Sequence, residues 1–115
     1  MANQDIKVRC YAFSLQVLKF LSSNEVDTKF RSIIDQLLRS STSIGANIIE
    51  AKSPSSKKEF IRYYEIALKS ANETKYWICL FRDGIKNNPE VKSLLNEADE
   101  ISKIIAASII KLKKK

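Results

Sequence analysis

Residues 39–82 read RSSTSIGANIIEAKSPSSKKEFIRYYEIALKSANETKYWICLFR, and this stretch decides the fold. The segment Ser53-Pro54-Ser55-Ser56 cannot continue a helix, because proline lacks a backbone donor and disfavours the α conformation at the preceding residue. Ser56 and Glu59 then have the spacing of a capping box, in which two side chains satisfy unpaired backbone N–H groups at a helix start. The stretch therefore predicts the second half of one helix, a tight turn and a complete second helix.

Apolar and small residues recur at spacings of three and four on both sides of this turn, as on the buried face of a bundle helix. Before the turn the series is Phe30, Ile34, Leu37, Ser41, Ile44, Ile48 and Ala51, and after it Phe60, Tyr64, Ala67, Ala71, Thr74, Ile78 and Phe81. Gly45 stands inside the first helix, where a glycine costs up to about 1 kcal/mol relative to alanine. We therefore expect a neighbouring backbone to approach closely at this position.

Apolar residues recur with the same spacing before and after this stretch, and they predict the first and the last helix. Asp27 and Asn88 are expected N-caps, Pro89 suits a first helical position, and Gly84 stands where a left-handed residue often ends a helix. The expected helices span residues 4–21, 28–51, 57–83 and 89–113. Because short connections favour antiparallel neighbours, we predict an all-α, up-down-up-down four-helix bundle in a single domain of residues 1–115.

The first helix has more apolar surface than the core of one bundle needs. Beside the series Ile6, Cys10, Phe13, Val17 and Phe20 it carries a second row, Val8, Tyr11, Leu15 and Leu18. Together the two rows exceed the ~100° stripe of a simple surface helix. We expect something outside the bundle's own core to cover the second row.

The composition is that of a folded, basic chain. Its 115 residues are 44% hydrophobic and 29% charged, and the net charge is +7. No uncharged apolar run approaches the ~18–20 residues of a membrane span, and the first residues do not resemble a secretory signal. Cys10 and Cys79 both fall on helical patterns, so we expect reduced thiols and a cytoplasmic location.

No pattern indicates catalysis, a cofactor or a metal site. The sequence has no histidine, its two glycines form no phosphate-binding loop, and no serine stands in a Gly-x-Ser-x-Gly context. We therefore expect no enzyme activity. An alternative makes Glu50 and Glu73 a catalytic pair or the ligands of a magnesium ion. It predicts that Glu50→Gln abolishes an activity while stability is retained.

Polar residues at helical offsets favour a structural network. Asn47 and Glu50 lie three positions apart on one helix, and Ser70 and Glu73 repeat this offset on the next. Since buried polar groups need partners, we expect hydrogen bonds that fix the register of the helices. The expected members are Arg39, Ser43, Asn47, Glu50, Ser70 and Glu73.

Basic residues gather around the turn and in the C-terminal tail. They could form a solvated face, or they could contact nucleic-acid phosphates in a salt-sensitive way. We expect the turn and the tail at opposite ends of the bundle, which would give two basic poles. Aromatic residues near the turn, such as Tyr64 and Trp77, suit either base stacking or core packing. The candidate contacts are Lys52, Lys57, Lys58, Arg62, Lys69, Lys111, Lys113, Lys114 and Lys115.

Residues 43–51, which read SIGANIIEA, resemble the motif Ser-Ile-x-x-Asn-Ile-x-Glu-Gly. In that motif's family the next helix carries a phenylalanine, an Ile-Ala pair, a serine and a glutamate, which match Phe60, Ile66, Ala67, Ser70 and Glu73. The chain thus resembles the four-helix bundle proteins encoded in intervening sequences of bacterial large-subunit ribosomal RNA genes. Ala51 replaces the family glycine, a change that slightly stiffens the helix end.

The resemblance implies a homo-oligomer, expected to be a pentamer, with wide apolar faces buried between subunits. A related protein, the accessory variability protein of diversity-generating retroelements, forms a barrel-like homopentamer that binds nucleic acid and a reverse transcriptase. RNA or DNA and a reverse transcriptase are therefore expected partners. Our leading hypothesis is a non-catalytic accessory factor that binds the RNA or DNA backbone. The alternative is a protein-binding scaffold without a nucleic-acid role.

Overall fold

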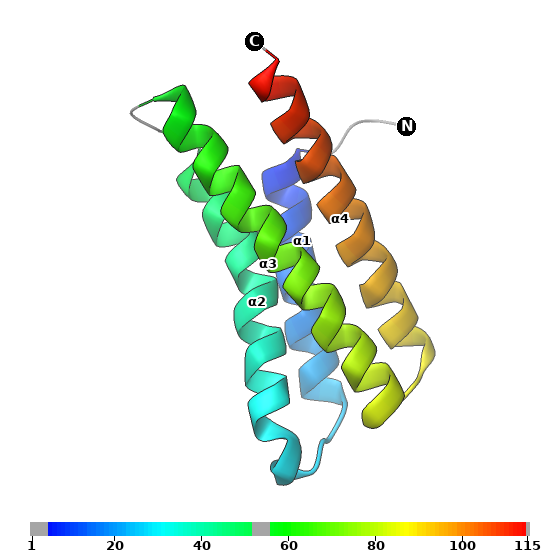
Figure 1. Ribbon diagram of the computed structural model, residues 1–115. Helices are drawn as coiled ribbons and strands as arrows, with labels where there is room; N and C mark the ends of the chain where they lie inside the picture. Colours follow the sequence, from blue (N-terminus) through cyan, green and yellow to red (C-terminus); the bar gives the residue numbers. More distant parts are fainter. Residues whose placement is uncertain (1–4, 52–55, 115) are drawn as a thin grey trace.

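The computed structural model describes residues 5–51 and 56–114, and this part of the chain contains helices and no strand. The helices are α1 (Ile6–Ser23), α2 (Arg31–Glu50), α3 (Lys57–Gly84) and α4 (Pro89–Lys113), with a short 3₁₀ turn at Thr28–Phe30 before α2. Each helix runs antiparallel to the one before it, in a body of 47 × 32 × 19 Å (Figure 1). The predicted all-α four-helix bundle is confirmed, whereas the predicted turn at residues 53–55 lies outside the described residues.

Each helix packs against two others, in the cyclic order α1, α2, α3, α4 and back to α1. The predicted seams supply the core, because the residues spaced three and four apart point into the space between the helices. The largest fully buried side chains include Phe13, Leu37, Ile44, Ile78, Phe81, Leu94, Ile101 and Ile105. Phe20, near the end of α1, and Phe81, near the end of α3, meet edge to face with ring centroids 5.2 Å apart.

Two of the three predicted N-caps lie at the start of an α-helix, and the third, Asp27, caps the short 3₁₀ turn before α2. Ser56 and Asn88 accept hydrogen bonds from the backbone N–H groups of Glu59 and Val91, both at 3.1 Å. Asp27 accepts from the N–H of Lys29, so it caps the 3₁₀ turn, and α2 begins four residues later at Arg31. A predicted N-cap can thus start a short 3₁₀ segment that leads into the α-helix.

The prediction that Gly84 ends the helix in a left-handed conformation is wrong. Gly84 is the last residue of α3 and has no positive φ, and the next residue, Ile85, also has helical φ and ψ. The N–H groups of Ile85 and Lys86 both bond to the carbonyl of Phe81, at 2.9 Å each. These bonds satisfy the helix end, so no left-handed residue is needed there.

Gly45 lies against the backbone of α1, as predicted. A Cβ atom added to Gly45 would be 3.2 Å from Cys10 Cβ and 3.7 Å from the Cys10 carbonyl carbon. The absence of a side chain therefore lets α2 approach α1 at the level of Cys10.

No helix in residues 5–51 and 56–114 is both long and apolar enough to cross a membrane.

Candidate functional site at the basic end of the bundle

The start of α3 and the end of α4 lie at the same end of the bundle (Figure 1). The expectation of two basic poles at opposite ends is therefore wrong. Between the turn after α2 and the end of α4 the chain passes through two antiparallel helices, which return it to the same end. A contact confirms the arrangement, because Lys113 Nζ lies 2.9 Å from Glu65 Oε2. We call this end, formed by α3 residues 57–65 and α4 residues 108–114, the basic end.

Positive charge is unevenly distributed between the two ends. Counting the described residues at the helix ends, the basic end and the adjoining ends of α1 and α2 hold seven cations and four carboxylates. The cations are Lys7, Lys57, Lys58, Arg62, Lys111, Lys113 and Lys114, and the carboxylates are Asp5, Glu50, Glu59 and Glu65. The opposite end holds six cations and five carboxylates. These are Lys19, Lys29, Arg31, Arg82, Lys86 and Lys92, against Glu25, Asp27, Asp35, Asp83 and Glu90.

An open hollow of about 470 Å³ lies on one side of the contact between α3 and α4 at the basic end. Lys58 and Arg62 line it from α3, and Lys113 lines it from α4. Lys58 and Arg62 are exposed, and neither makes an ion pair within the described residues. Lys57 and Ile61 complete the wall beside Glu65. Unpaired cations at the rim of a hollow present a local positive field to anions.

A second hollow, of about 300 Å³, also lies between α3 and α4 at this end. Its lining is Phe60, Tyr64, Ser108, Lys111 and Leu112. The rings of Phe60 and Tyr64 stack with centroids 4.9 Å apart and an interplanar angle of 21°. Lys111 is exposed at its edge. The periodicity of the sequence placed both rings in the core series, but Phe60, at the end of that series, is only half-buried.

The remaining candidate cations lie elsewhere. Lys69 is exposed on α3 two turns beyond Arg62, outside both hollows. Lys114 follows the last residue of α4, where its N–H bonds to the carbonyl of Ile110. Lys52 and Lys115 lie outside the described residues.

Most of the expected polar network joins α2 to α3. The hydroxyls of Ser43 and Ser70 are 2.9 Å apart, and Asn47 Nδ2 donates to the Ser43 carbonyl at 2.8 Å. Near the middle of the helices, Arg39 Nη2 lies 2.5 Å from Glu73 Oε2. That oxygen also accepts a 2.9 Å bond from the indole N–H of Trp77, a member that sequence reasoning missed.

Glu50 does not join this network. It is exposed at the last residue of α2, and it makes no hydrogen bond within the described residues. Glu73 instead faces Arg39, which lies three helical turns from Glu50 on α2. The structure therefore does not bring the two carboxylates together. Among residues 5–51 and 56–114, no three Asp, Glu, Cys or His side chains are grouped so as to hold a metal ion.

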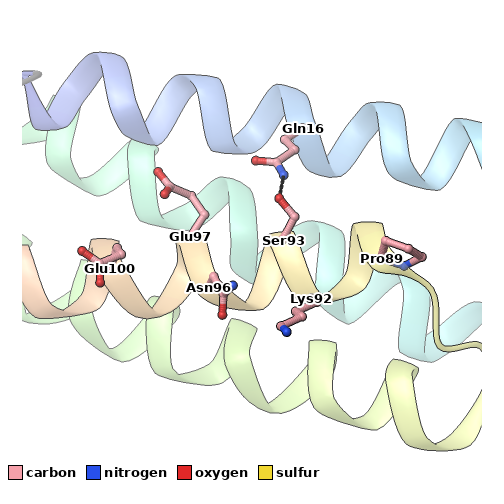
Figure 2. Close-up of a pocket in the computed structure, with 7 residues that line it drawn as sticks. All are labelled: Gln16, Pro89, Lys92, Ser93, Asn96, Glu97 and Glu100. Atoms are coloured by element: carbon pink, nitrogen blue, oxygen red, sulfur yellow. Dashed lines mark hydrogen bonds between the residues drawn. The ribbon is translucent and has the colours of Figure 1, made fainter.

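A polar hollow runs between α1 and α4 toward the opposite end (Figure 2). Gln16 Nε2 on α1 donates a hydrogen bond across the hollow to Ser93 Oγ on α4 at 3.3 Å. Glu97 and Glu100 project from α4 further along the hollow. Lys92 is the cation in its lining. With two carboxylates and one cation, this groove does not share the positive character of the basic end.

The sequence model described as 23S rRNA-intervening sequence protein matches residues 2–107. The chain belongs to this family. One similar solved structure is a protein of unknown function from the S23 ribosomal protein family of Bacteroides thetaiotaomicron. It is 33% identical with a TM-score of 0.76, and the alignment covers 91% of this chain and 98% of that one. No curated protein sequence matches this chain. The family membership agrees with the resemblance found in residues 43–73.

Proposed function

We propose that this family member is a non-catalytic, self-associating bundle that binds the phosphate backbone of RNA or DNA through its basic end. The observation that carries the proposal is that exposed cations from α3 and α4 together, Lys58, Arg62 and Lys113, line one open hollow at this end. Backbone contact needs a set of positive side chains without strict geometry, and it does not need a reaction centre.

Lys58 and Arg62 are the central residues of the proposal. Both are exposed on the outer face of α3, and Lys113 approaches them from α4 across the hollow. Lys113 is partly neutralised by Glu65, whereas Lys58 and Arg62 have no carboxylate partner in the described residues. Each phosphate neutralised by such a side chain releases counterions and adds to the salt dependence of binding.

The test compares two double substitutions that remove the same charge. Lys58→Gln/Arg62→Gln alters the basic end, and Lys19→Gln/Lys92→Gln alters exposed lysines at the opposite end. Affinity for fluorescently labelled RNA and DNA of mixed sequence is measured from 50 to 200 mM salt. The first pair should weaken binding and reduce the slope of log K against log salt by roughly 1.4–1.8, since each phosphate contact contributes about 0.7–0.9. Equal effects of both pairs would reject the basic end as the binding surface.

Self-association is supported by the second apolar row of α1. Tyr11 is 67% exposed, Val8 53% and Leu18 44%, and this row lies away from the bundle core. Contiguous exposed apolar surface of this kind usually marks a protein interface. Sedimentation velocity at micromolar concentration tests the proposal, and the pentamer implied by the resemblance predicts five subunits. Leu18→Glu should shift the protein to smaller species without loss of helix content.

The same apolar row also favours the second candidate, a scaffold for other proteins. The two candidates give different results in the salt titration, because a scaffold would show no linear dependence of nucleic-acid binding on salt. A reverse transcriptase, the partner implied by the resemblance, is tested by co-purification with and without nuclease. Retention after nuclease treatment would indicate direct protein contact.

A further inference from the structure

We infer that the hollow between Phe60 and Lys111 holds an unpaired nucleobase of a single-stranded nucleic acid, stacked on the Phe60 ring. This inference rests on the proposed function, since it adds base contacts to backbone contacts at the same end. It predicts a preference for single strands over duplexes that charge alone would not give.

The first argument is the position of the aromatic pair. Phe60 and Tyr64 are one helical turn apart on α3, and their rings stack with centroids 4.9 Å apart. Tyr64 is buried while Phe60 is half-buried, so Phe60 is the outer ring of the pair. Because both rings line the same hollow, a planar group entering it can extend an aromatic stack that already exists.

The second argument is the chemistry of the rim. Lys111 lines the hollow beside Phe60, it is exposed, and it makes no ion pair within the described residues. Among the described residues no carboxylate lines the hollow, whereas Glu65 lies in the wall of its neighbour. An aromatic face next to a free cation is the combination that single-strand binding proteins use, with the ring under a base and the cation near its phosphate.

The third argument is continuity with the phosphate-binding surface. α3 residues 57–65 carry both Phe60 and the cations Lys58 and Arg62, and α4 carries both Lys111 and Lys113. The two hollows therefore share the same pair of helix segments. Phe60 lies two positions from Lys58 and from Arg62, so its ring is on another side of α3. A strand that contacts both hollows therefore has to cross the contact between α3 and α4.

The experiment removes the ring and keeps the charge. Phe60→Leu is compared with Phe60→Trp, which restores an aromatic face, and with Phe30→Leu as a matched control. Phe30 is also half-buried beside a lysine, with Lys29 Nζ 5.3 Å from its ring, but it lies at the opposite end. The probes are a labelled 20-nucleotide poly(U) RNA, the same RNA with one 2-aminopurine, and a blunt RNA duplex.

Phe60→Leu should weaken single-strand binding by roughly 5- to 150-fold, the range for loss of one stacked base, while duplex binding changes less than twofold. The wild type should quench the fluorescence of 2-aminopurine, and Phe60→Leu should remove this quenching. Phe60→Trp should restore both properties, and Phe30→Leu should leave both unchanged. Circular dichroism confirms that each variant keeps its helix content.

Other outcomes separate the two proposals. Unchanged single-strand affinity and quenching in Phe60→Leu, with the salt effect of Lys58→Gln/Arg62→Gln intact, would overturn the stacking site and leave the backbone proposal standing. Failure of the wild type to bind either probe at 50 mM salt would overturn both proposals. Equal loss of single-strand and duplex affinity in Phe60→Leu would identify Phe60 as a structural residue only.

Discussion

Arg9 on α1 and Glu97 on α4 form a two-point ion pair, with Arg9 Nε and Nη2 lying 2.7 and 2.9 Å from the two carboxylate oxygens. The hydrogen bond to Glu97 raises the pKa of the Arg9 guanidinium. The side chains are only 23% and 27% exposed, so solvent screens the pair less than a surface pair. The contact joins the first and last helices and so closes the bundle.

Glu97→Gln should lower the free energy of unfolding by about 1–3 kcal/mol, the cost of losing charge-assisted hydrogen bonds at a partly buried site. The control is Glu65→Gln, which breaks the more exposed pair with Lys113 and should cost less than about 1 kcal/mol. Urea denaturation followed by circular dichroism measures both. Equal losses would show that burial of the Arg9 pair adds nothing.

Gly45→Val tests the close approach of α2 to α1. A valine must displace Cys10, whose Cβ would already be 3.2 Å from the first added carbon, and such overpacking costs about 1–3 kcal/mol. Ala46→Val makes a similar change one residue along on an exposed position and should cost less than about 1 kcal/mol. A Gly45→Val protein as stable as the Ala46→Val protein would contradict the packing.

The hydroxyl of Thr74 links α3 to α2 inside the core. Thr74 Oγ1 is 3.0 Å from Ser40 Oγ and 2.7 Å from the Ser70 carbonyl, and Thr74 and Ser40 are fully buried. Thr74→Val keeps the shape of the side chain and removes the donor, so it should cost about 1 kcal/mol. In a double-mutant cycle with Ser40→Ala, the coupling energy should be about 0.5–1.5 kcal/mol. A coupling energy near zero would mean that the hydrogen bond adds no stability.

Because the thiol of Cys10 is buried, the free energy of unfolding should fall as the pH rises in the alkaline range. Burial raises the pKa of this thiol from 9.0 to about 12, and the nearby Glu97 contributes in the same direction. Between these values the unfolded chain loses the proton while the folded chain keeps it, so stability falls as pH rises. In a Cys79→Ala background, the free energy of unfolding should fall from pH 9 to 11 more steeply with Cys10 than with Cys10→Ala. The two slopes of the free energy of unfolding against pH should differ by at most ~1.4 kcal/mol per pH unit. Parallel pH profiles of the two proteins would contradict the shifted pKa of Cys10.

Much of the fold could be predicted because the deciding signals are local. The spacing of Phe13, Ile44, Ile78 and Ile101 follows from helix geometry alone, and the caps at Ser56 and Asn88 depend on neighbours three residues away. Gly84 was misinterpreted because either a left-handed residue or an extra turn can satisfy the last carbonyls of a helix, and the sequence does not distinguish them.

The candidate site was harder to predict because its residues come from distant parts of the chain. Lys113 and Glu65 are 48 positions apart, and Arg9 and Glu97 are 88 apart, so neither pair has a sequence signature. The stack of Phe60 on Tyr64 does have one, since residues four apart share a helix face. Its accessibility, however, depends on where α4 ends relative to α3.

An even number of antiparallel helices returns the end of α4 to the end of the bundle at which α1 and α3 begin (Figure 1). Any ring of copies built around an axis along the helices would consequently be one-sided, with every positive end facing the same way and the opposite rim close to neutral. Such a particle would attract a polyanion to one rim only. It also means that a purification tag fused to either terminus would crowd that rim, whereas the connection between α3 and α4 offers a point of attachment that leaves it clear.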